Sequence, residues 1–261
     1  MRSLNIAATG MLAQQLNVEV ISNNIANMNT TAFKRQRAEF QDLLYQDQER
    51  VGSASSDTGT IVPAGIQVGV GVKTAAVYRI TEQGNLVSTD NTYDIAVQGK
   101  GYFAITLPNG DTAYTRAGSF QLSPQGTIVT TDGYTVAPGI TIPNNALGVT
   151  INPSGEVLVK IQGTVAPQNV GQLTLSNFAN EAGLDPLGDN LLLETPASGP
   201  AIGGAPGTPG FGTILQGFLE TSNVNVVQEV TNLITAQRAY EMNSKVIEAS
   251  DEMMRSLTQL R

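Results

Sequence analysis

The chain has 261 residues, of which 41% are hydrophobic and only 14% charged, and its formal net charge is −8. This length suits one large or two modest domains, and the acidic balance argues against a nucleic-acid partner. Cys and His are absent, which excludes disulfides, Ser–His and Cys–His nucleophile pairs, and metal sites built from thiolate or imidazole ligands.

Membrane and cofactor signals are also missing from the sequence. No apolar run is long enough to span a bilayer, so we expect no membrane insertion. The opening residues, MRSLNIAATGMLAQQ, lack the unbroken apolar core of a cleaved signal peptide. Residues 99–104, GKGYFA, match a dinucleotide fingerprint, but a strand and turn follow where a helix is required. We therefore predict no catalytic, cofactor-binding or metal-binding residues.

Residues 3–28 carry the period of a long helix. One row of side chains repeats every seven residues, and a second row follows it by three. The two rows are Leu4, Met11, Val18 and Ile25, and Ala7, Gln14, Ile21 and Met28. This spacing predicts a narrow apolar seam, typical of a coiled-coil strand.

Charge is almost missing from this helix, because Glu19 is the only charged residue between Arg2 and Lys34. A solvated helix face normally carries more charge. Gly10 costs about 1 kcal/mol in helix propensity, which indicates that another helix packs against it. We expect the helix to be covered by more than one partner; the alternative is a single buried helix in a monomer.

The stretch that follows is mixed in character. Lys34, Arg35 and Arg37 form a short basic cluster, which predicts either a solvated face or a local ion-pair site. Residues 46–65 are polar and turn-rich and predict a loop or mobile arm. Residues 68–80 then alternate in hydrophobicity, beginning with two glycines that let another backbone come close, which predicts a strand.

Residues 85–193 predict an all-β body, because short alternating runs lie between recurring turn signals. The four turns are Pro108-Asn109-Gly110, Pro124-Gln125-Gly126, Thr131-Asp132-Gly133 and Pro153-Ser154-Gly155. Turns at this spacing are typical of a sandwich or a barrel. Residues 195–213 are dense in Gly and Pro and predict an exposed flexible connector.

Residues 223–260 contain no Gly or Pro and predict a second long helix with one apolar seam. The main row repeats every seven residues, and a second row is partly filled. These rows are Val226, Leu233, Tyr240, Ile247 and Met254, and Val230, Ala236 and Leu257.

The helix should begin at Asn225, a good capping residue. Glu241–Lys245 and Asp251–Arg255 predict i,i+4 pairs on its outer face. Such a helix is too long for a compact domain of this size, so it needs another long helix, from this chain or from other copies. The alternative is a plain amphipathic helix packed on its own globule.

Matched seams near both ends predict an antiparallel helix pair, with the middle of the chain as a separate body. The expected fold class is α+β, with long N- and C-terminal coiled-coil-like helices, a central all-β domain and an extended β arm. We assign residues 1–32 and 220–261 to the helical domain. Residues 33–80 form the arm and linking region, and residues 81–219 form the β-rich outer domain, which ends in the connector at 195–213.

Three blocks of the sequence match the patterns of a known family. They are SNNIANMNTTAFKRQRAEFQDLLYQ at 22–46, GKGYFAITLPNGDTAYTRAGSFQLSPQG at 99–126 and ETSNVNVVQEVTNLITAQRAYEMNSK at 220–245. They resemble the axial rod and hook proteins of the bacterial flagellum, and within them the distal rod group of the basal body. The opening MRSLNIAATG, the chain length and the polar stretch at 46–65 favour this group over proximal rod and hook proteins.

The resemblance assigns family motif positions along the chain. They are Asn23, Asn24, Asn27, Phe33, Lys34, Tyr114, Arg116, Gly118, Phe120, Ser222, Asn223, Asn225, Gln237, Arg238 and Tyr240. Ala32 stands where the family usually has Gly before Phe33 and Lys34, so we expect a differently shaped turn there.

The resemblance implies a structural subunit without enzymatic activity or cofactor. The subunit would polymerise helically into a rigid, hollow drive shaft that crosses the periplasm and transmits torque to the hook. Its implied partners are further copies of itself, proximal rod proteins, the hook protein, the P- and L-ring proteins, a rod-cap peptidoglycan hydrolase and the type III export apparatus. The alternatives are another axial protein, such as the hook protein, or a secreted β-domain binding module or enzyme with helical tails.

Overall fold

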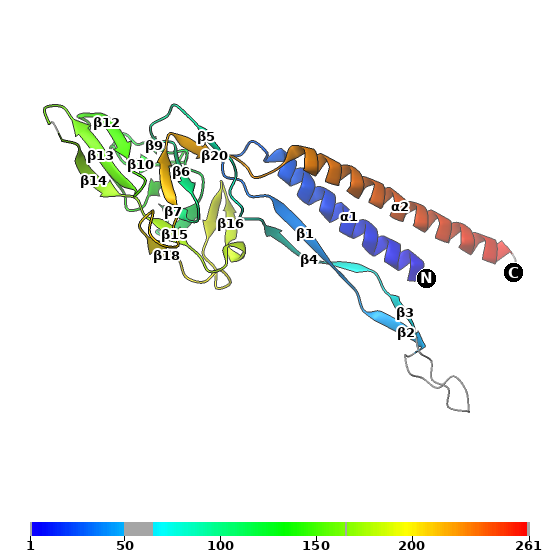
Figure 1. The fold of residues 1–261 in the computed structure, drawn as a ribbon. Helices are drawn as coiled ribbons and strands as arrows, with labels where there is room; N and C mark the ends of the chain where they lie inside the picture. The colour runs from blue at the N-terminus through cyan, green and yellow to red at the C-terminus, as the bar shows by residue number, and fades with distance from the viewer. Residues whose placement is uncertain (1, 50–64, 165, 260–261) are drawn as a thin grey trace. The chain divides into compact units, whose positions relative to one another are not determined.

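The computed structural model describes residues 2–49, 65–164 and 166–259. It is an α+β fold with one long helix near each end and a β-rich middle (Figure 1). The chain divides into two compact units. Unit 1 comprises Met1–Ala26, Gln36–Tyr78 and Asn225–Arg261, and unit 2 comprises Asn27–Arg35 and Arg79–Val224.

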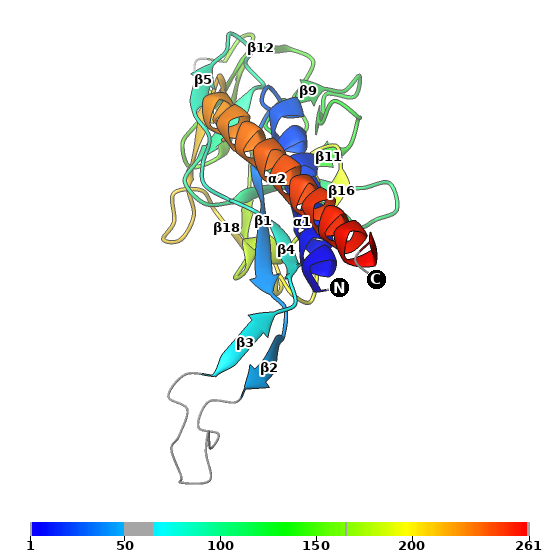
Figure 2. The ribbon, with the colours of Figure 1, turned by 90° about the vertical axis from the view of Figure 1, so that its right-hand side faces the viewer.

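The two helices of unit 1 are α1 (Arg2–Ala26) and α2 (Val226–Gln259), and they lie side by side in opposite directions (Figures 1 and 2). Ser3 near the start of α1 meets Ser250, whereas Asn24 near its end meets Glu229. α2 begins where predicted, because the Asn225 side-chain oxygen accepts the Val227 N–H at 3.1 Å. The predicted antiparallel direction is thus present within this unit.

One of the two predicted i,i+4 pairs on α2 is formed. Arg255 Nη2 lies 2.9 Å from Asp251 Oδ2. Within the described chain Glu241 and Lys245 form no ion pair, so that prediction was wrong. An exposed pair of this kind stabilises a helix by only about 0.3–0.5 kcal/mol. This gain is too small to offset the side-chain entropy that is lost when two long side chains are held in one geometry.

The arm of unit 1 consists of two antiparallel strand pairs, and Figure 2 shows it as a narrow ribbon. β1 (Gln36–Asp42) pairs with β4 (Val72–Arg79), and β2 (Tyr45–Glu49) pairs with β3 (Ile66–Gly69). The polar stretch predicted as a loop therefore begins as a strand, and its residues 50–64 lie outside the described residues.

The strand predicted for residues 68–80 is split in two at Gly71. This glycine has a φ of +130°, and an added Cβ would lie 2.2 Å from the Thr9 hydroxyl of α1. The Val72 N–H also donates to that hydroxyl, at 3.3 Å. Gly71 therefore allows the close backbone approach that the sequence predicted, here against a helix.

Unit 2 is built from short strands and one 3-10 turn, η1 (Glu181–Gly183). The strands are β5 (Leu86–Ser88), β6 (Ile95–Gln98), β7 (Tyr102–Thr106), β8 (Thr112–Thr115), β9 (Gln121–Leu122), β10 (Ile128–Val129), β11 (Thr135–Val136), β12 (Ala146–Ile151), β13 (Glu156–Ile161), β14 (Gln168–Gln172), β15 (Leu175–Asn177), β16 (Asp185–Gly188), β17 (Leu191–Leu193), β18 (Ile202–Gly204), β19 (Thr213–Gln216) and β20 (Phe218–Glu220).

The largest sheet of unit 2 follows the order β16-β17-β8-β7-β11-β10-β9, with β15 and β18 branching from β7. Its two ends do not meet, so the described strands form no closed barrel and the barrel alternative was wrong. A three-stranded sheet, β12-β13-β14, and the pairs β19-β6 and β20-β5 complete the unit. The dinucleotide-like motif leads into β7, a strand, as predicted.

All four predicted hairpins are confirmed. The turns join β7 to β8, β9 to β10, β10 to β11 and β12 to β13, and each pair is antiparallel. The glycine that ends each turn has a φ between +83° and +90°. At Gly126 the reason is steric as well, because an added Cβ would lie 2.4 Å from the Ile142 carbonyl oxygen.

The core of unit 2 includes the fully buried side chains of Phe103, Phe120 and Val157. The segment 195–213, predicted as an exposed flexible connector, contributes to this unit instead. It contains β18, and its Ser198 is only 1% exposed. The Ser198 hydroxyl donates to the Thr195 carbonyl and stabilises the turn at 195–198. The Gly and Pro residues of this segment therefore form ordered turns and not a flexible linker.

Candidate functional site

The most unusual chemistry in unit 2 is a carboxylate shared by two cations. Glu220 is 1% exposed; its Oε1 lies 2.5 Å from Lys34 Nζ, and its Oε2 lies 2.6 Å from Arg116 Nε. The Gly84 N–H also donates to Oε1, at 2.9 Å. Lys34 and Arg116 are 8% and 7% exposed, so all three charges are buried. We call Lys34, Arg116 and Glu220 the charge junction.

Lys34 brings two further segments to the junction. Its ammonium donates to the Glu82 carbonyl at 2.8 Å. Burial lowers the pKa of Lys34, and the neighbouring Glu220 carboxylate opposes that shift. The backbone is tied in as well, since the Ala32 N–H donates to the Glu220 carbonyl at 2.8 Å. The predicted ion-pair role of the basic cluster is therefore confirmed at Lys34, and the solvated-face alternative is wrong there.

Asn223 fastens the same segments with its side-chain amide. Its Oδ1 accepts the Arg35 N–H at 2.7 Å, and its Nδ2 donates to the carbonyls of Ile80 at 2.9 Å and Glu82 at 3.0 Å. Residues 32–35, 80–84 and 220–223 are thus held together although they lie far apart in the sequence.

Arg116 connects the junction to the β strands. Its Nη1 donates to the Gly101 carbonyl at 3.1 Å, and its Nη2 donates to the carbonyls of Gly99 at 2.5 Å and Val97 at 3.3 Å. Gly99 and Gly101 have positive φ angles, a backbone conformation that favours glycine at both positions. The glycines that mimic a dinucleotide motif therefore bind an arginine of the same chain.

The junction leaves no reactive group free. Every buried side-chain nitrogen or oxygen of the described residues has a hydrogen-bond partner. No group of three or more acidic residues that could hold a metal occurs among them. Both carboxylate oxygens of Glu220 are engaged by the two cations and the Gly84 N–H, so this arrangement fastens segments of the chain together.

In unit 1, small and polar side chains of α2 lie along the line where this helix contacts α1. An added Cβ on Gly10 would lie 3.0 Å from Asn243 Nδ2, and the Ser250 hydroxyl donates to Ser3 at 3.3 Å. The row on α2 repeats every seven residues and consists of small or polar residues: Glu229, Ala236, Asn243 and Ser250. We call this row the polar seam.

Asn24 closes one end of the polar seam and joins three elements. Its Nδ2 donates to Glu229 Oε2 at 3.2 Å and to the Gln36 carbonyl at 2.8 Å, while its Oδ1 accepts the Gln36 N–H at 2.8 Å. It therefore binds the first residue of β1 as a neighbouring strand would. Asn24 and Glu229 are 1% and 2% exposed.

The predicted seam residues are distributed unequally. Ala7, Ile21 and Ala236 are buried. Seven others are half-buried: Leu4, Met11, Val18, Ile25, Leu233, Ile247 and Met254. Val226, Val230 and Tyr240 are exposed by 39%, 41% and 44%, and the side chain of Leu257 lies outside the described residues. Ala236 of the predicted second row belongs to the polar seam, and the assembly role of the exposed seam residues stays a prediction.

The family motif positions fall in both units. In unit 2, Tyr114 packs edge-on against Phe178 at 4.8 Å, and Phe120 packs against Phe103 at 5.1 Å. Gly118 has no room for a side chain, because an added Cβ would lie 1.5 Å from the Ile95 carbonyl oxygen. Their roles are therefore packing and close approach.

The remaining motif positions lie on α1, at turns and on α2. Asn27 Oδ1 accepts the Thr30 hydroxyl, the Phe33 carbonyl accepts the Asn223 N–H, and Ser222 Oγ accepts the Val224 N–H. Asn23, Gln237, Arg238 and Tyr240 are exposed. Ala32 has a φ of +56°, which explains why glycine suits this turn.

The sequence did not identify Glu220 or Glu229 as site residues. Each is a single acidic residue in a polar stretch, where an exposed position is the ordinary expectation. The available signal was that Glu220 ends a short apolar run, GFLE, before the motif TSN.

Comparison with known families gives three matches along the chain. The model "Flagella basal body rod protein" matches residues 4–34, and "Flagellar hook protein FlgE/F/G D1 domain" matches residues 96–159. "Flagellar basal body rod FlgEFG protein C-terminal" matches residues 215–260. Within the described residues neither helix is both long and apolar enough to cross a membrane.

Several curated relatives align over nearly their whole length. The "Flagellar basal-body rod protein FlgG" of Caulobacter vibrioides is 64% identical over 261 residues, which is 100% of both chains. The protein of the same name from Agrobacterium fabrum is 54% identical and covers 97% of each chain. That of Bacillus subtilis is 40% identical and covers 100% of this chain and 99% of its own.

Proposed function

The chain belongs to the FlgG family of flagellar basal-body rod proteins, and from this premise we propose that it forms the distal part of the rod. It is a structural subunit of the flagellar rod and not an enzyme. In our proposal it polymerises helically into a rigid hollow shaft that crosses the periplasm, turns inside the P- and L-rings and transmits torque to the hook. Full-length similarity does not favour the hook or secreted-module alternatives.

The observation that carries the proposal is the charge junction. Residues 32–35, which follow α1 in the chain, and residues 220–223, which precede α2, are fastened in unit 2 through one carboxylate and one amide. A shaft subunit has to carry a load between its helices and its outer body, and charge-assisted hydrogen bonds are shorter and stronger than neutral ones. A binding module with helical tails has no need of such a fastening.

The remaining parts of the proposal concern assembly. Residues 1–32 and 220–261 would form a coiled-coil lining of the inner tube, residues 33–80 an arm that limits bending, and residues 81–219 the outer wall. Proximal rod proteins, the hook protein, a rod-cap peptidoglycan hydrolase and the export apparatus would be further partners, with export needing no cleaved signal peptide. The half-buried apolar side chains along α1 and α2 support further burial on assembly, at roughly 1.5–3 kcal/mol for each fully buried side chain.

Removing residues 2–30 tests the proposal. We expect the truncated chain to keep the near-ultraviolet dichroism of its aromatic residues in unit 2 but to form no rods in electron micrographs and to restore no motility. The control is Leu147→Asp, at a 65% exposed position on β12, which should still form rods. Rods built from the truncated chain would refute the proposal.

A further inference from the structure

The hairpin turn between β7 and β8 carries a pair of residues that is chemically labile. Asn109 is followed by Gly110, and this is the one Asn-Gly pair in the sequence, since every other asparagine precedes a residue with a side chain. Glycine has no Cβ to obstruct the approach of its backbone nitrogen to the preceding side chain. Both residues are exposed, so water reaches them. The turn is therefore a candidate site of covalent modification.

The modification is the loss of ammonia from the asparagine side chain. The Gly110 backbone nitrogen attacks Asn109 Cγ, a new N–Cγ bond forms, and the Cγ–Nδ2 bond breaks. The proton of the Gly110 N–H passes through water to Nδ2, which leaves as ammonia. Water then opens the resulting succinimide ring at either carbonyl and yields aspartate or isoaspartate. The reaction consumes only water, and either product adds a carboxylate to an already acidic chain.

In the folded chain each reacting group is held by another partner. The Gly110 N–H donates to the Leu107 carbonyl at 3.0 Å, which fixes the attacking nitrogen in the turn. Asn109 Nδ2 donates to Asp111 Oδ2 at 2.7 Å, and Asn109 Oδ1 accepts the Asp111 N–H at 3.1 Å. Ring closure requires the side-chain amide to leave these contacts. The bond to the Asp111 carboxylate is charge-assisted and hence the stronger of the two.

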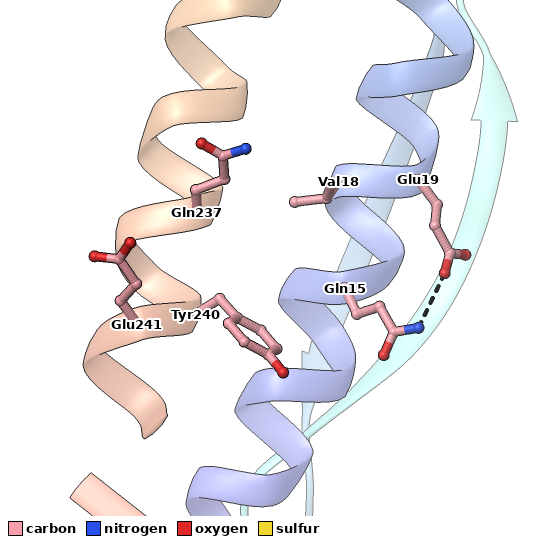
Figure 3. Close-up of a pocket in the computed structure, with 6 residues that line it drawn as sticks. All are labelled: Gln15, Val18, Glu19, Gln237, Tyr240 and Glu241. Atoms are coloured by element: carbon pink, nitrogen blue, oxygen red, sulfur yellow. Dashed lines mark hydrogen bonds between the residues drawn. The ribbon is translucent and has the colours of Figure 1, made fainter. Parts of the chain in front are cut away.

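An amide–carboxylate bond by itself does not make such a site. Figure 3 shows one on α1, at the edge of the groove between α1 and α2, where Gln15 Nε2 donates to Glu19 Oε1 at 3.1 Å. Gln15 is followed by Leu16 within the helix, so no glycine nitrogen lies beside its amide. At Asn109 the labile pair and the restraining carboxylate of Asp111 occur together.

We propose that Asn109 is a site of spontaneous deamidation and that Asp111 sets its rate in the folded chain. The Asp111 carboxylate restrains the amide and slows ring closure, whereas unfolding removes the restraint. An isoaspartate would lengthen the backbone of the turn between β7 and β8, strands that supply Phe103 and Ala113 to the core of unit 2. The inference concerns one hairpin and does not depend on assembly into a rod.

Mass spectrometry of tryptic peptides tests the inference. Cleavage after Lys100 and Arg116 releases a peptide in which Asn109 is the only amide side chain, so the mass gain of that peptide reports this site alone. The full-length chain is incubated at mildly alkaline pH, folded and in urea, beside its folded Asp111→Ala variant. Asp111→Ala should raise the rate about tenfold, the factor expected for one lost hydrogen bond to a charged group, and unfolding should raise it further.

Asp132→Ala is the matched control, because it removes the same charge from an exposed position in the next hairpin turn and should leave the rate at Asn109 unchanged. Unchanged near-ultraviolet dichroism of Asp111→Ala shows that a faster reaction comes from the turn and not from global unfolding. If that variant unfolds, Asp111→Ser decides in its place, since serine suits turns but carries no charge. A variant that reacts no faster than the unmodified chain, or an Asn109 that reacts equally fast folded and unfolded, would overturn the inference.

Discussion

At the scale of single residues, the stability of the charge junction depends on the side chain of Glu220. Its carboxylate neutralises Lys34 and Arg116, and all three groups are buried. Burying an ion pair does not by itself stabilise a protein, because desolvation offsets much of the attraction. Removing one partner is different, since the remaining charges stay buried without compensation.

Glu220→Gln should therefore lower the free energy of unfolding by about 3–5 kcal/mol, because two buried cations then face each other across a neutral amide. Chemical denaturation of unit 2, followed by tyrosine fluorescence, measures this. Asp132→Asn, at an exposed turn position, is the control and should change stability by less than about 0.5 kcal/mol. Adding Lys34→Met to Glu220→Gln should recover part of the loss, and no recovery would contradict the charge argument.

Ala32 gives a prediction of the opposite sign. Its φ of +56° costs a non-glycine residue about 1–2 kcal/mol, whereas glycine costs about 0.5–1 kcal/mol in backbone entropy. Ala32→Gly should therefore raise the free energy of unfolding by up to about 1 kcal/mol in the same denaturation experiment.

Ala182→Gly is the matched control for Ala32→Gly. Ala182 is exposed in η1 and has no positive φ, so the same substitution should lower stability by roughly 0.5–1 kcal/mol. Equal effects of the two substitutions would show that backbone strain at Ala32 is negligible.

At the scale of elements, α1 and α2 meet through small and polar residues rather than through two apolar rows. Gly10 and Ser3 of α1 face Asn243 and Ser250 of α2. Small residues let the helix axes approach, and the polar ones find partners there.

Gly10→Leu should disrupt this contact, because even a Cβ would lie 3.0 Å from Asn243. We expect a loss of about 1–3 kcal/mol from overpacking, measured as earlier thermal loss of the helical dichroism signal. Asn243→Ala should restore part of it by making room. A gain in helical stability from Gly10→Leu alone, as expected from helix propensity, would mean that the two helices do not pack closely at this point.

The sequence predicted the helices, their direction and the four hairpins, because these depend on local period and turn chemistry. Asn225 was predictable as a cap for the same reason. The polar seam was not predicted, because heptad analysis weights apolar residues and passes over Glu229 and Asn243. The order within 195–213 was missed because Gly and Pro mark ordered turns and flexible linkers alike.

At the scale of the whole molecule, the charge junction could be predicted only as far as local sequence patterns identify its members. Lys34 and Arg116 could be named from motif resemblance, but their common partner Glu220 lies in no heptad or hairpin pattern. Which distant residues share one buried carboxylate is fixed by tertiary structure alone.

The interleaving of segments in unit 2 has a consequence for synthesis. Lys34 and Arg116 are synthesised long before Glu220, so the growing chain carries both cations before it contains the carboxylate that neutralises them. Until that carboxylate arrives, closing the β body would bury uncompensated charge. The nascent protein is thereby discouraged from folding early, which agrees with the export that we propose for this chain.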